Sequence, residues 1–307
     1  MRILVTGANG LVGSALCREG LRRGHEVHAL CREGANTELV PARATLVRGV
    51  FHRPAEARRL IAEVRPEAIL HAAAVVSTGR PDLEQSLRIN VTGTRILADA
   101  AREGGVARWL QVSSMSAHAA NRSIYGGTKY LADRTLEESG IPLTIIRPSL
   151  VYAPQRRGLF DKMVRILSRA PVIPLIGFGN EPVRPVHADD LAWAFGEALA
   201  RPETIGRTYQ LGGADAMTFG EMVERICRAL GRSTLLLPIP LPICRLGALA
   251  AESILPNPPA TTDNIEGIIR AQEVDNSAAE RDLVYTPRSF DAGLVECLAA
   301  LRVGKNA

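Results

Sequence analysis

The sequence has few aromatic residues, and its charged residues form no long run of a single sign. Tryptophan, tyrosine and phenylalanine make up 4% of the 307 residues, which argues against a stacking surface for single-stranded nucleic acid. The net charge is +5, and the excess is spread along the chain instead of forming a basic tail. This balance indicates a mild attraction for anionic small molecules and does not indicate a nucleic-acid-binding protein.

The sequence also lacks metal-type cysteine spacings and long hydrophobic runs. Its five cysteines include no CxxC pair, so we expect free thiols in a reducing compartment and no metal site. Three prolines and Arg245 interrupt residues 233–255, the nearest approach to the ~18 apolar residues of a membrane span. The first residues, MRILVTG, lead directly into a strand and a glycine turn, which leaves no room for a signal peptide. We therefore expect a cytoplasmic protein without a membrane span, and a homodimer is left open.

The order of the predicted elements indicates the fold. Short β-branched, apolar runs alternate with segments whose apolar residues recur at helical spacing. The strands predicted on this basis are residues 2–6, 25–31, 44–50, 67–74, 107–113, 143–152 and 207–213. A long helix is predicted from Asp82 toward Gly104. The repeated βα order predicts an α/β fold, a doubly wound parallel sheet of the Rossmann type with helices on both faces.

The composition of the sequence changes after residue 152. Prolines and glycines interrupt the next thirty or so residues, and then residues 184–200 predict a strand and helix that return to the main sheet. We predict a dinucleotide-binding Rossmann domain from residues 1–152 plus about 183–212. A smaller, discontinuous substrate lobe is predicted from about 153–182 plus 213–307, and its last part reads as a proline-rich tail with one clear helix, residues 219–231.

A glycine turn follows the first predicted strand. Gly7, Gly10 and Gly13 lie between this strand and a predicted helix. A side chain on Gly7 or Gly10 would block the close approach of a dinucleotide's pyrophosphate, whose charge suits the N–H groups and the positive dipole end of a helix. Gly13 lets the helix lie close to the sheet. The turn therefore predicts a dinucleotide-binding site.

The GxxGxxG spacing after Thr6 resembles the short-chain dehydrogenase/reductase superfamily, particularly its extended branch, the NAD(P)-dependent epimerase/dehydratase family. The resemblance covers nearly the whole chain and implies an NAD(P) cofactor. It places small alanines of the HAAA segment under the cofactor's ribose and diphosphate, and a proline of the IIRPSLVYAP segment beside the nicotinamide. The cofactor residues that it adds to the glycines are Asn9, Leu11, Val12, Ala72, Ala73, Ala74 and Pro148.

The end of the second predicted strand bears on the choice of cofactor. An NAD site commonly offers a carboxylate there to the ribose 2′-hydroxyl, but this sequence has Cys31 followed by Arg32. An arginine suits a 2′-phosphate, which predicts NADP, although NAD stays possible and Arg32 has the alternative role of a solvated surface residue. Val50 and Phe51 stand where many members of the family carry an adenine-contacting aspartate, so the adenine must be held by other means.

A tyrosine and a lysine follow the fifth predicted strand. Tyr125 and Lys129 are four residues apart, which places both on one face of a helix. Lowering a tyrosine pKa from about 10 by three units requires roughly 4 kcal/mol. A lysine charge ~4 Å away supplies about that much at an effective dielectric constant of ~20. We therefore predict that Lys129 lowers the pKa of Tyr125 and that Tyr125 is the general acid/base.

The same segment offers three serines that could orient a substrate oxygen. Ser114 is favoured because the resemblance aligns it with the family's SS element, while Ser113 is assigned to the strand and Ser116 is the alternative. The resemblance also implies that Asn90 holds a water on the proton path from the lysine; its alternative role is to bond neighbouring backbone. The adjacent glycines 126 and 127 have two possible explanations. They allow a close approach by the cofactor or a neighbouring chain segment, or they form a flexible helix start.

Three functions are compatible with these residues. The preferred one is an NADP-dependent oxidoreductase that acts on a small hydroxyl or carbonyl substrate by a Ser-Tyr-Lys mechanism. The second is a nucleotide-sugar epimerase or dehydratase with retained NAD(P), whose diphosphate Arg184, Arg156 or Arg157 could meet, although only ten residues separate Ser114 from Tyr125. The third is an NADPH-binding structural or assembly protein, since the YQLGGADAMTFGEMVERICRALGR segment resembles a subgroup related to the nucleotide-binding accessory subunit of respiratory complex I.

Two further features of the return segment have structural interpretations. His187 is expected to be structural, and Asp189 or Asp190 is expected to cap the helix that follows.

Overall fold

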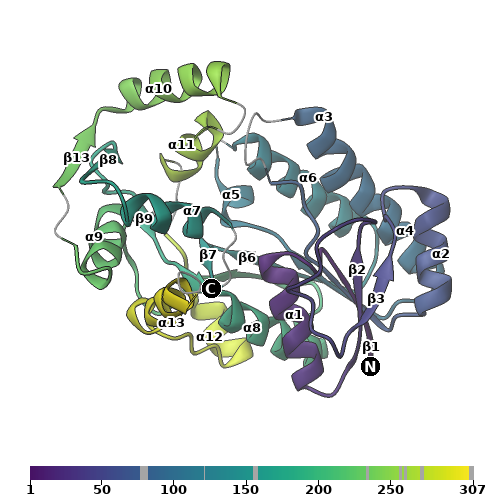
Figure 1. The fold of residues 1–307 in the computed structure, drawn as a ribbon. Coiled ribbons are helices and arrows are strands. Elements are labelled where there is room, and N and C mark those ends of the chain that lie inside the picture. Colours follow the sequence, from purple (N-terminus) through teal and green to yellow (C-terminus); the bar gives the residue numbers. More distant parts are fainter. Residues whose placement is uncertain are drawn as a thin grey trace.

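A seven-stranded parallel sheet forms the centre of the molecule (Figure 1). The computed structural model describes residues 1–76, 82–120, 122–154, 158–232, 235–255, 258, 261–269 and 273–303. The strands follow the order β11-β6-β5-β4-β1-β2-β3, with every neighbouring pair parallel. They are β1 (Arg2–Thr6), β2 (Glu26–Cys31), β3 (Thr45–Arg48), β4 (Ala68–His71), β5 (Arg108–Val112), β6 (Leu143–Pro148) and β11 (Thr208–Leu211). The predicted doubly wound α/β fold is confirmed.

Helices cover both faces of this sheet, as predicted. One face packs against α1 (Leu11–Arg22), α8 (Ala188–Ala200) and α12 (Ser277–Leu283), and the other against α2 (Pro54–Val64), α4 (Thr94–Glu103) and α6 (Ile124–Glu138). Side chains alternate across a strand, so in β1 Ile3 and Val5 join the first core while Leu4 joins the second. The near-continuous apolar strands of the sequence thus reflect a sheet that is buried on both sides.

The predicted helix from Asp82 toward Gly104 is divided by a wider turn. It consists of α3 (Leu83–Ser86), a π-helical segment η1 (Leu87–Gly93) and α4. The Asp82 carboxylate caps α3 by accepting from the Gln85 N–H at 2.9 Å, as its position before the helix predicts. A Cβ on Gly93 would lie 2.9 Å from the His52 Cβ, so glycine lets η1 pack closely on the loop after β3. π-helical turns frequently mark functional sites, and this one contains Asn90.

Two predictions about the later strands are wrong. The predicted strand 143–152 ends in the main sheet at Pro148, where the Ser149 N–H makes a last bond to the Leu211 carbonyl at 2.9 Å. Beyond it, β7 (Val151–Tyr152) pairs with β10 (Val186–His187) in a separate two-stranded sheet, so the returning strand does not rejoin the main sheet. The helix after it, α8, does return, and η2 (Pro202–Thr204) connects α8 to β11.

Several of the remaining elements pack around a third hydrophobic core. Short sheets here pair β8 (Val172–Ile176) with β13 (Leu235–Ile239) and β9 (Pro182–Val183) with β12 (Met217–Thr218). The helices are α7 (Gly158–Leu167), α9 (Phe219–Ala229), α10 (Leu241–Ile254), α11 (Thr262–Ile269) and α13 (Phe290–Val303). Within the described residues, no helix is both long and apolar enough to cross a membrane.

The two-lobe division of the chain stays a prediction, and the packing of α12 bears on its boundary. Ala279, Leu283 and Tyr285 belong to the core of the main sheet, although the division assigns residues 213–307 to the second lobe. Helices α10, α11, α12 and α13 were not predicted, because the prolines of residues 238–259 and Pro287 made the sequence after residue 231 look like an irregular tail.

Candidate functional site

The predicted site residues come together at the carboxyl edge of the main sheet. Register fixes this edge, because Thr6 pairs with His71 across β1 and β4, and Val112 pairs with Ile146 across β5 and β6. Four of the predicted residues lie at the ends of these strands: Gly7 follows β1, Ala72 follows β4, Ser114 lies just after β5 and Pro148 ends β6. Open α/β sheets bind their ligands at this edge.

The glycine turn is closed by contacts within the protein. Gly7 has a φ of +63°, and a Cβ on it would lie 2.8 Å from the Ala73 Cα, so both its conformation and its neighbour require glycine. A Cβ on Gly13 would collide with the Gly7 carbonyl oxygen. The expectation that Gly13 serves helix-to-sheet packing is therefore corrected: its close neighbour is the turn itself. The result is a cradle whose backbone is open to a ligand.

The amino end of α1 suits an anion. Gly10 is its N-cap, no side chain caps the helix there, and its first turn carries no acidic residue. Leu11 and Val12 are half-buried at this end, and the amide of Asn9 donates to the Asn36 carbonyl at 3.1 Å, which ties the turn to the loop after β2. Unused N–H groups and the helix dipole favour a diphosphate at this position. The residues present fit the predicted dinucleotide.

Two arginines meet where the ribose end of such a cofactor would lie. Arg32 is exposed directly after β2, and its carbonyl accepts a hydrogen bond from Arg48 Nη1 at 2.8 Å. Arg48 was not singled out from the sequence; the signal is the register, which pairs it with Cys31. Phe51 is only 8% exposed and packs edge-to-face on His71, so it offers no open surface for stacking an adenine.

The side chains of Ser114 and Tyr125 lie beside each other, and the Ser114 hydroxyl acts on the pKa of Tyr125 as a hydrogen-bond partner. Ser114 caps α5 (Met115–His118), and its Oγ also accepts from the Ser116 N–H at 3.1 Å, so Ser116 supports Ser114 instead of replacing it. Burial raises the pKa of Tyr125 to about 12, while the bond to Ser114 opposes this shift. The direction is opposite to the predicted one.

Lys129 explains why the tyrosine pKa is not lowered. Its ammonium is 2% exposed and donates to the Val112 carbonyl at 2.5 Å. Burial lowers the pKa of Lys129 to about 8, and the carboxylate of Asp133 opposes that shift. The lysine charge is thus engaged with the end of β5 and with Asp133, and it does not offset the desolvation of the tyrosine.

Asp133 is a site residue that sequence reasoning missed. It is 1% exposed and accepts from Ser113 Oγ at 2.6 Å and from Arg147 Nη2 at 3.2 Å. Burial raises its pKa, and Lys129 and Arg147 oppose the increase. The available signal was its place four residues after Lys129 on the same helix face. Lys129, Asp133 and Arg147 thus form one charge cluster, in which the first two residues are fully buried.

Asn90 uses its side chain to join two elements. Its Oδ1 accepts from the Val75 N–H at 2.7 Å, and its Nδ2 donates to Thr128 Oγ1 at 3.1 Å. The structure therefore shows the alternative considered for Asn90, a polar residue that bonds neighbouring backbone. Its second partner, Thr128, precedes Lys129 on α6. Its part in a proton path stays a prediction.

His71 lies at the centre of a directed chain of hydrogen bonds. Thr94 Oγ1 donates to the Asn90 carbonyl at 2.7 Å, so it accepts from His71 Nε2 at 3.0 Å. Thr6 Oγ1 accepts from the Ala73 N–H and donates to His71 Nδ1 at 2.8 Å. The neutral ring with its proton on Nε2 satisfies every partner. Burial lowers the pKa of His71 to about 3, which keeps the ring neutral.

Two other predicted residues, His187 and Arg184, have structural roles. His187 is the N-cap of α8 and accepts from the Asp189 N–H at 3.2 Å, so the expected capping by Asp189 or Asp190 is wrong. Arg184 donates to the carbonyls of Gly213 and Val274 at 2.7 and 3.1 Å, which engages it with backbone. Arg156 and Arg157 lie outside the described residues.

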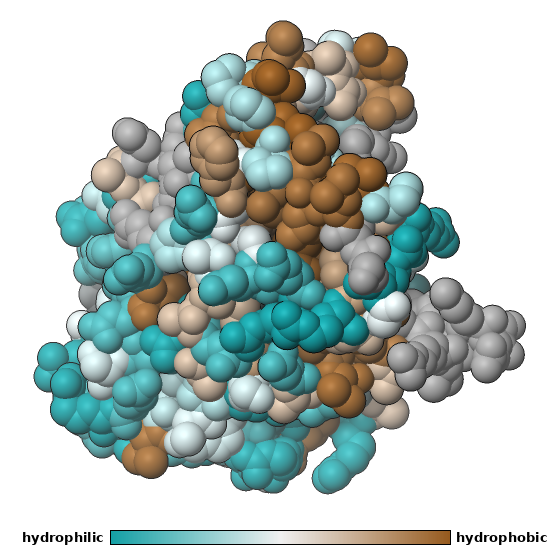
Figure 2. Space-filling model, turned by 90° about the vertical axis from the view of Figure 1, so that its left-hand side faces the viewer, coloured by the Kyte–Doolittle hydropathy of each residue, from teal (hydrophilic) through white to brown (hydrophobic). Residues whose placement is uncertain are grey.

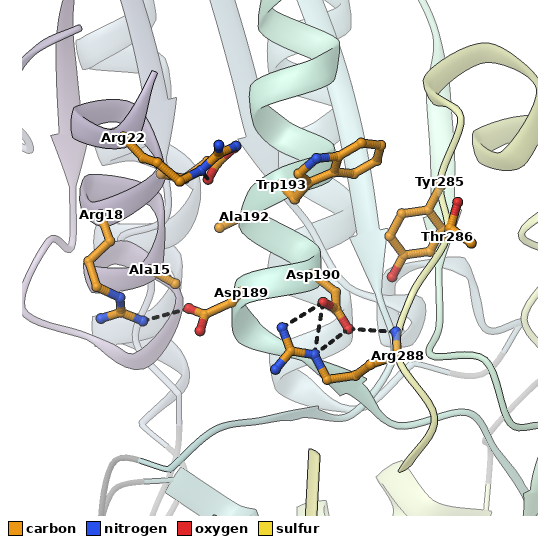
Figure 3. A pocket seen from close by; sticks show the side chains of 11 residues that line it. Ala15, Arg18, Arg22, Asp189, Asp190, Ala192, Trp193, Tyr285, Thr286 and Arg288 are labelled. Atoms are coloured by element: carbon orange, nitrogen blue, oxygen red, sulfur yellow. Dashed lines mark hydrogen bonds and ion pairs between the residues drawn. The ribbon is translucent and has the colours of Figure 1, made fainter. Parts of the chain in front are cut away.

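A separate pocket of about 500 Å³ lies between α1, α8 and the segment after α12 (Figure 3). None of Ser114, Tyr125 and Lys129 lines it. Its charges are largely paired, because Arg18 bonds Asp189 at 2.7 Å and Arg288 bonds Asp190 at 3.0 Å (Figure 3). These pairs clamp α1 and the C-terminal segment onto α8, and we assign the pocket no part in the site at the sheet edge.

Comparison with known proteins agrees with this geometry. Residues 3–212 match the family model described as the NAD dependent epimerase/dehydratase family. A 2-alkyl-3-oxoalkanoate reductase from Stenotrophomonas maltophilia (strain K279a) is 26% identical over 327 residues, covering 96% of this chain and 97% of that protein. The crystal structure of UDP-glucose 4-epimerase from Thermotoga maritima, with UDP-glucose, has a TM-score of 0.80 at 20% identity and covers 99% of this chain and 100% of its own.

A further relative comes from mitochondria. The NADH dehydrogenase (ubiquinone) 1 alpha subcomplex subunit 9 of Arabidopsis thaliana is 28% identical over 219 residues, covering 68% of this chain and 54% of that protein. It is the kind of protein to which the segment at residues 209–232 shows a resemblance. The chain is thus similar to reductases, to a sugar epimerase and to a respiratory subunit on one common fold.

Proposed function

Because the chain belongs to the NAD-dependent epimerase/dehydratase family of enzymes, we propose that it is an NADP-dependent oxidoreductase acting on a small hydroxyl or carbonyl compound. The observation that carries the proposal is the juxtaposition of Ser114 and Tyr125 at the carboxyl edge of the sheet, with Lys129 buried and bonded to the end of β5. Hydride transfer is the chemistry that a bound nicotinamide supplies. The full-length similarity to a reductase supports a net redox reaction.

The protonation state of Tyr125 favours the direction of reduction. With a pKa of about 12, the hydroxyl keeps its proton at neutral pH, so it can donate this proton to a carbonyl oxygen. Ser114 Oγ is placed to hold the same oxygen. Lys129 keeps a positive charge below about pH 8, and its ammonium holds the Val112 carbonyl at the end of β5, two residues before Ser114. In this mechanism Tyr125 is the acid, Ser114 orients the substrate and the charged Lys129 holds the strand end that leads to Ser114.

Replacing Tyr125 tests the mechanism. We expect Tyr125→Phe to lower kcat by about 10²-fold or more, since a positioned acid contributes roughly 10²–10⁴. The measurement is NADPH oxidation with a panel of aldehydes, ketones and 3-oxo acids, the last chosen because a full-length relative is a 2-alkyl-3-oxoalkanoate reductase. Tyr130→Phe, one turn further along α6, is the matched control. Full turnover by Tyr125→Phe would contradict the mechanism.

The preference for NADP rests on Arg32 and Arg48. Together they provide two guanidinium groups and no carboxylate at the end of β2, which suits a 2′-phosphate. We expect Arg32→Ala to weaken NADPH binding by about tenfold or more and to leave NADH binding nearly unchanged, since one charge-assisted bond contributes roughly 1.5–3 kcal/mol. Arg43→Ala, also exposed between β2 and β3, is the control. An unchanged ratio of the two dissociation constants would refute this assignment.

A redox-neutral epimerase or dehydratase is the second candidate, supported by the match to a sugar-nucleotide epimerase over its whole length. The ten residues between Ser114 and Tyr125 form a short connection that includes the single turn α5, which leaves less chain for sugar recognition. An enzyme of this kind recycles its cofactor without releasing it. Purified protein that carries one nicotinamide cofactor per chain and consumes no added NADPH would favour this candidate.

A structural or assembly role is the third candidate, supported by the respiratory relative. The match covers little more than half of that protein, so it supports such a role for the shared part and not for the whole subunit. NADPH binding without turnover of any carbonyl in the panel would favour this role.

A further inference from the structure

Helix α10 carries its apolar side chains on the outside. Ile243, Leu246 and Leu249 recur on one face with exposed fractions of 60%, 69% and 55%, and Ile254 at the end of the helix is 77% exposed. Residues three or four apart share a helix face, so these side chains form one stripe. A surface helix of a globular protein normally directs this stripe toward the core.

The charged side chains of α10 point the other way. All residues of this helix are described, and its two charged ones bond neighbouring protein: Arg245 pairs with Glu266 of α11 at 2.7 Å, and Glu252 accepts from the Thr262 N–H at 2.6 Å. The helix is therefore fixed by its polar side and leaves its apolar side free. Because exposing apolar side chains to water is unfavourable, this orientation of α10 is the reverse of the one expected for a surface helix.

The apolar stripe continues onto the neighbouring sheet. Leu235 and Leu237 of β13 are 64% and 47% exposed, and Phe178, just after β8, is 74% exposed. The Gly177 N–H bonds the Ile239 carbonyl at 2.9 Å, which places Phe178 beside the junction of β13 and α10. Figure 2 shows the apolar surface spreading over the upper part of this side of the molecule. We call this surface, on α10, β13 and residue 178, the apolar patch.

Basic residues border the apolar patch. Arg232 bonds the carbonyls of Ser168 and Ala170, which brings together the two chain segments that enter β13 and β8. Arg169 and Arg228 are exposed in the same region. Other basic residues nearby are engaged with acids, because Arg165 pairs with Asp161, Arg225 with Asp291 and Arg245 with Glu266. The basic border of the patch is therefore formed by Arg169, Arg228 and Arg232.

We propose that the apolar patch is a docking surface for an anionic lipid bilayer. An apolar helix face bordered by arginines matches the two layers of such a surface, since apolar side chains enter the acyl boundary and basic ones meet the phosphate groups. Helix α10 has 14 residues and is about 21 Å long at 1.5 Å per residue, so it lies along the surface and does not span it. In a symmetric dimer through the same patch, the two basic borders would face each other and repel.

Docking at this patch would bring the sheet-edge site toward the bilayer. Helix α10 packs on α11, and α11 contacts α6, which carries Tyr125 and Lys129 (Figure 1). The attached enzyme would therefore face substrates that are dissolved in the membrane. The attachment itself does not depend on the proposed reaction.

Co-sedimentation of the full-length protein with vesicles tests the proposal. We expect binding to vesicles of equal parts phosphatidylglycerol and phosphatidylcholine, at least about tenfold weaker binding to phosphatidylcholine alone, and loss of the difference at high salt. The double variant Ile243→Gln, Leu246→Gln should bind the anionic vesicles at least about tenfold more weakly than the wild type, because each side chain loses most of its apolar transfer energy. Arg169→Ala with Arg228→Ala should reduce the preference for phosphatidylglycerol.

The matched control is Val295→Gln on α13, where the valine is 67% exposed outside the patch; it should bind as the wild type does. All variants should unfold at the wild-type denaturant midpoint, which shows that they fold. The proposal is overturned if the wild type does not sediment with anionic vesicles, or if the double variant does so unchanged. It is also overturned if size-exclusion chromatography shows a dimer that the double variant converts to a monomer, which would identify a second copy as the occupant.

Discussion

At the scale of single residues, Asp133 helps to keep the buried Lys129 charged. Asp133 and Lys129 are 1% and 2% exposed, and the carboxylate opposes the desolvation that lowers the lysine pKa to about 8. We expect Asp133→Asn to lower the pKa of Lys129 further, so that activity declines at a lower pH than in the wild type. A pH profile of kcat measures this shift.

The same residue is also structural. Removing one partner of a buried ion pair typically costs about 3–5 kcal/mol, so Asp133→Ala should lower the free energy of unfolding by that amount, and Asp133→Asn by less. Ser113→Ala is the control, because it removes the 2.6 Å hydrogen bond and keeps the charge. An alkaline limb that moves equally in Ser113→Ala and Asp133→Asn would show that packing, and not charge, is responsible.

The residues that sequence could identify are those whose partners are near in the chain. Tyr125, Lys129 and Ser114 follow from a helical spacing and the end of a strand. Arg147 meets Asp133 because α6 packs on β6, and the bonded residues Thr6 and His71 are 65 positions apart. No local pattern contains these contacts, because parallel pairing brings together segments that are far apart in sequence. The predicted direction of the Tyr125 pKa shift was wrong because the sequence does not show that the tyrosine is buried.

At the scale of elements, the tandem glycines of α6 have different neighbours. A Cβ on Gly126 would collide with the Ser116 carbonyl of α5, whereas a Cβ on Gly127 would have nothing within 4 Å. We expect Gly126→Ala to force α5 and α6 apart, to weaken the Ser114–Tyr125 bond and to lower the free energy of unfolding by about 1–3 kcal/mol. Gly127→Ala should raise it by about 1 kcal/mol, because alanine is the better helix former. Denaturant unfolding and kcat measure both effects.

Gly127→Ala also separates the two explanations left open for the pair. Weaker NADPH binding with an unchanged or higher free energy of unfolding would show that the cofactor approaches Gly127. Equal destabilisation by both substitutions would contradict the assigned neighbours. A close approach at this glycine pair could be expected from the sequence. The sequence does not show which glycine is required, because that depends on the path of α5, a single turn without a periodic pattern.

The π-helical segment is another element-scale feature beyond the reach of periodicity. Residues 82–104 have the composition of a single helix, and the wider turn at Leu87–Gly93 follows from tertiary contacts of Asn90 with Val75 and Thr128. The strand order, by contrast, could be predicted because βα alternation with short connections leaves few right-handed arrangements. β7 and β10 were assigned to the main sheet since two-residue strands are too short to carry a pattern of their own.

At the scale of the whole molecule, His71 links the stability of the fold to pH. Its ring joins β1, β4 and the segment that contains Asn90, and it packs against Phe51 and Trp109 with ring centroids 5.1 and 5.2 Å away. Unfolding releases the ring into water, where its pKa returns to about 6.5. Between this value and the folded pKa of about 3, the unfolded chain binds a proton that the folded chain does not.

The free energy of unfolding should therefore fall as the pH falls from about 6.5 toward 3, by on the order of 4 kcal/mol at 1.36 kcal/mol per pKa unit. Chemical denaturation of the wild type and His71→Gln across this range measures the contribution, because glutamine can replace both hydrogen bonds without titrating. The variant should start from lower stability at pH 7 and lose less on acidification. His118→Gln, which changes an exposed histidine, should retain the wild-type slope. Equal slopes for His71→Gln and the wild type would show that acid unfolds this sheet through other groups.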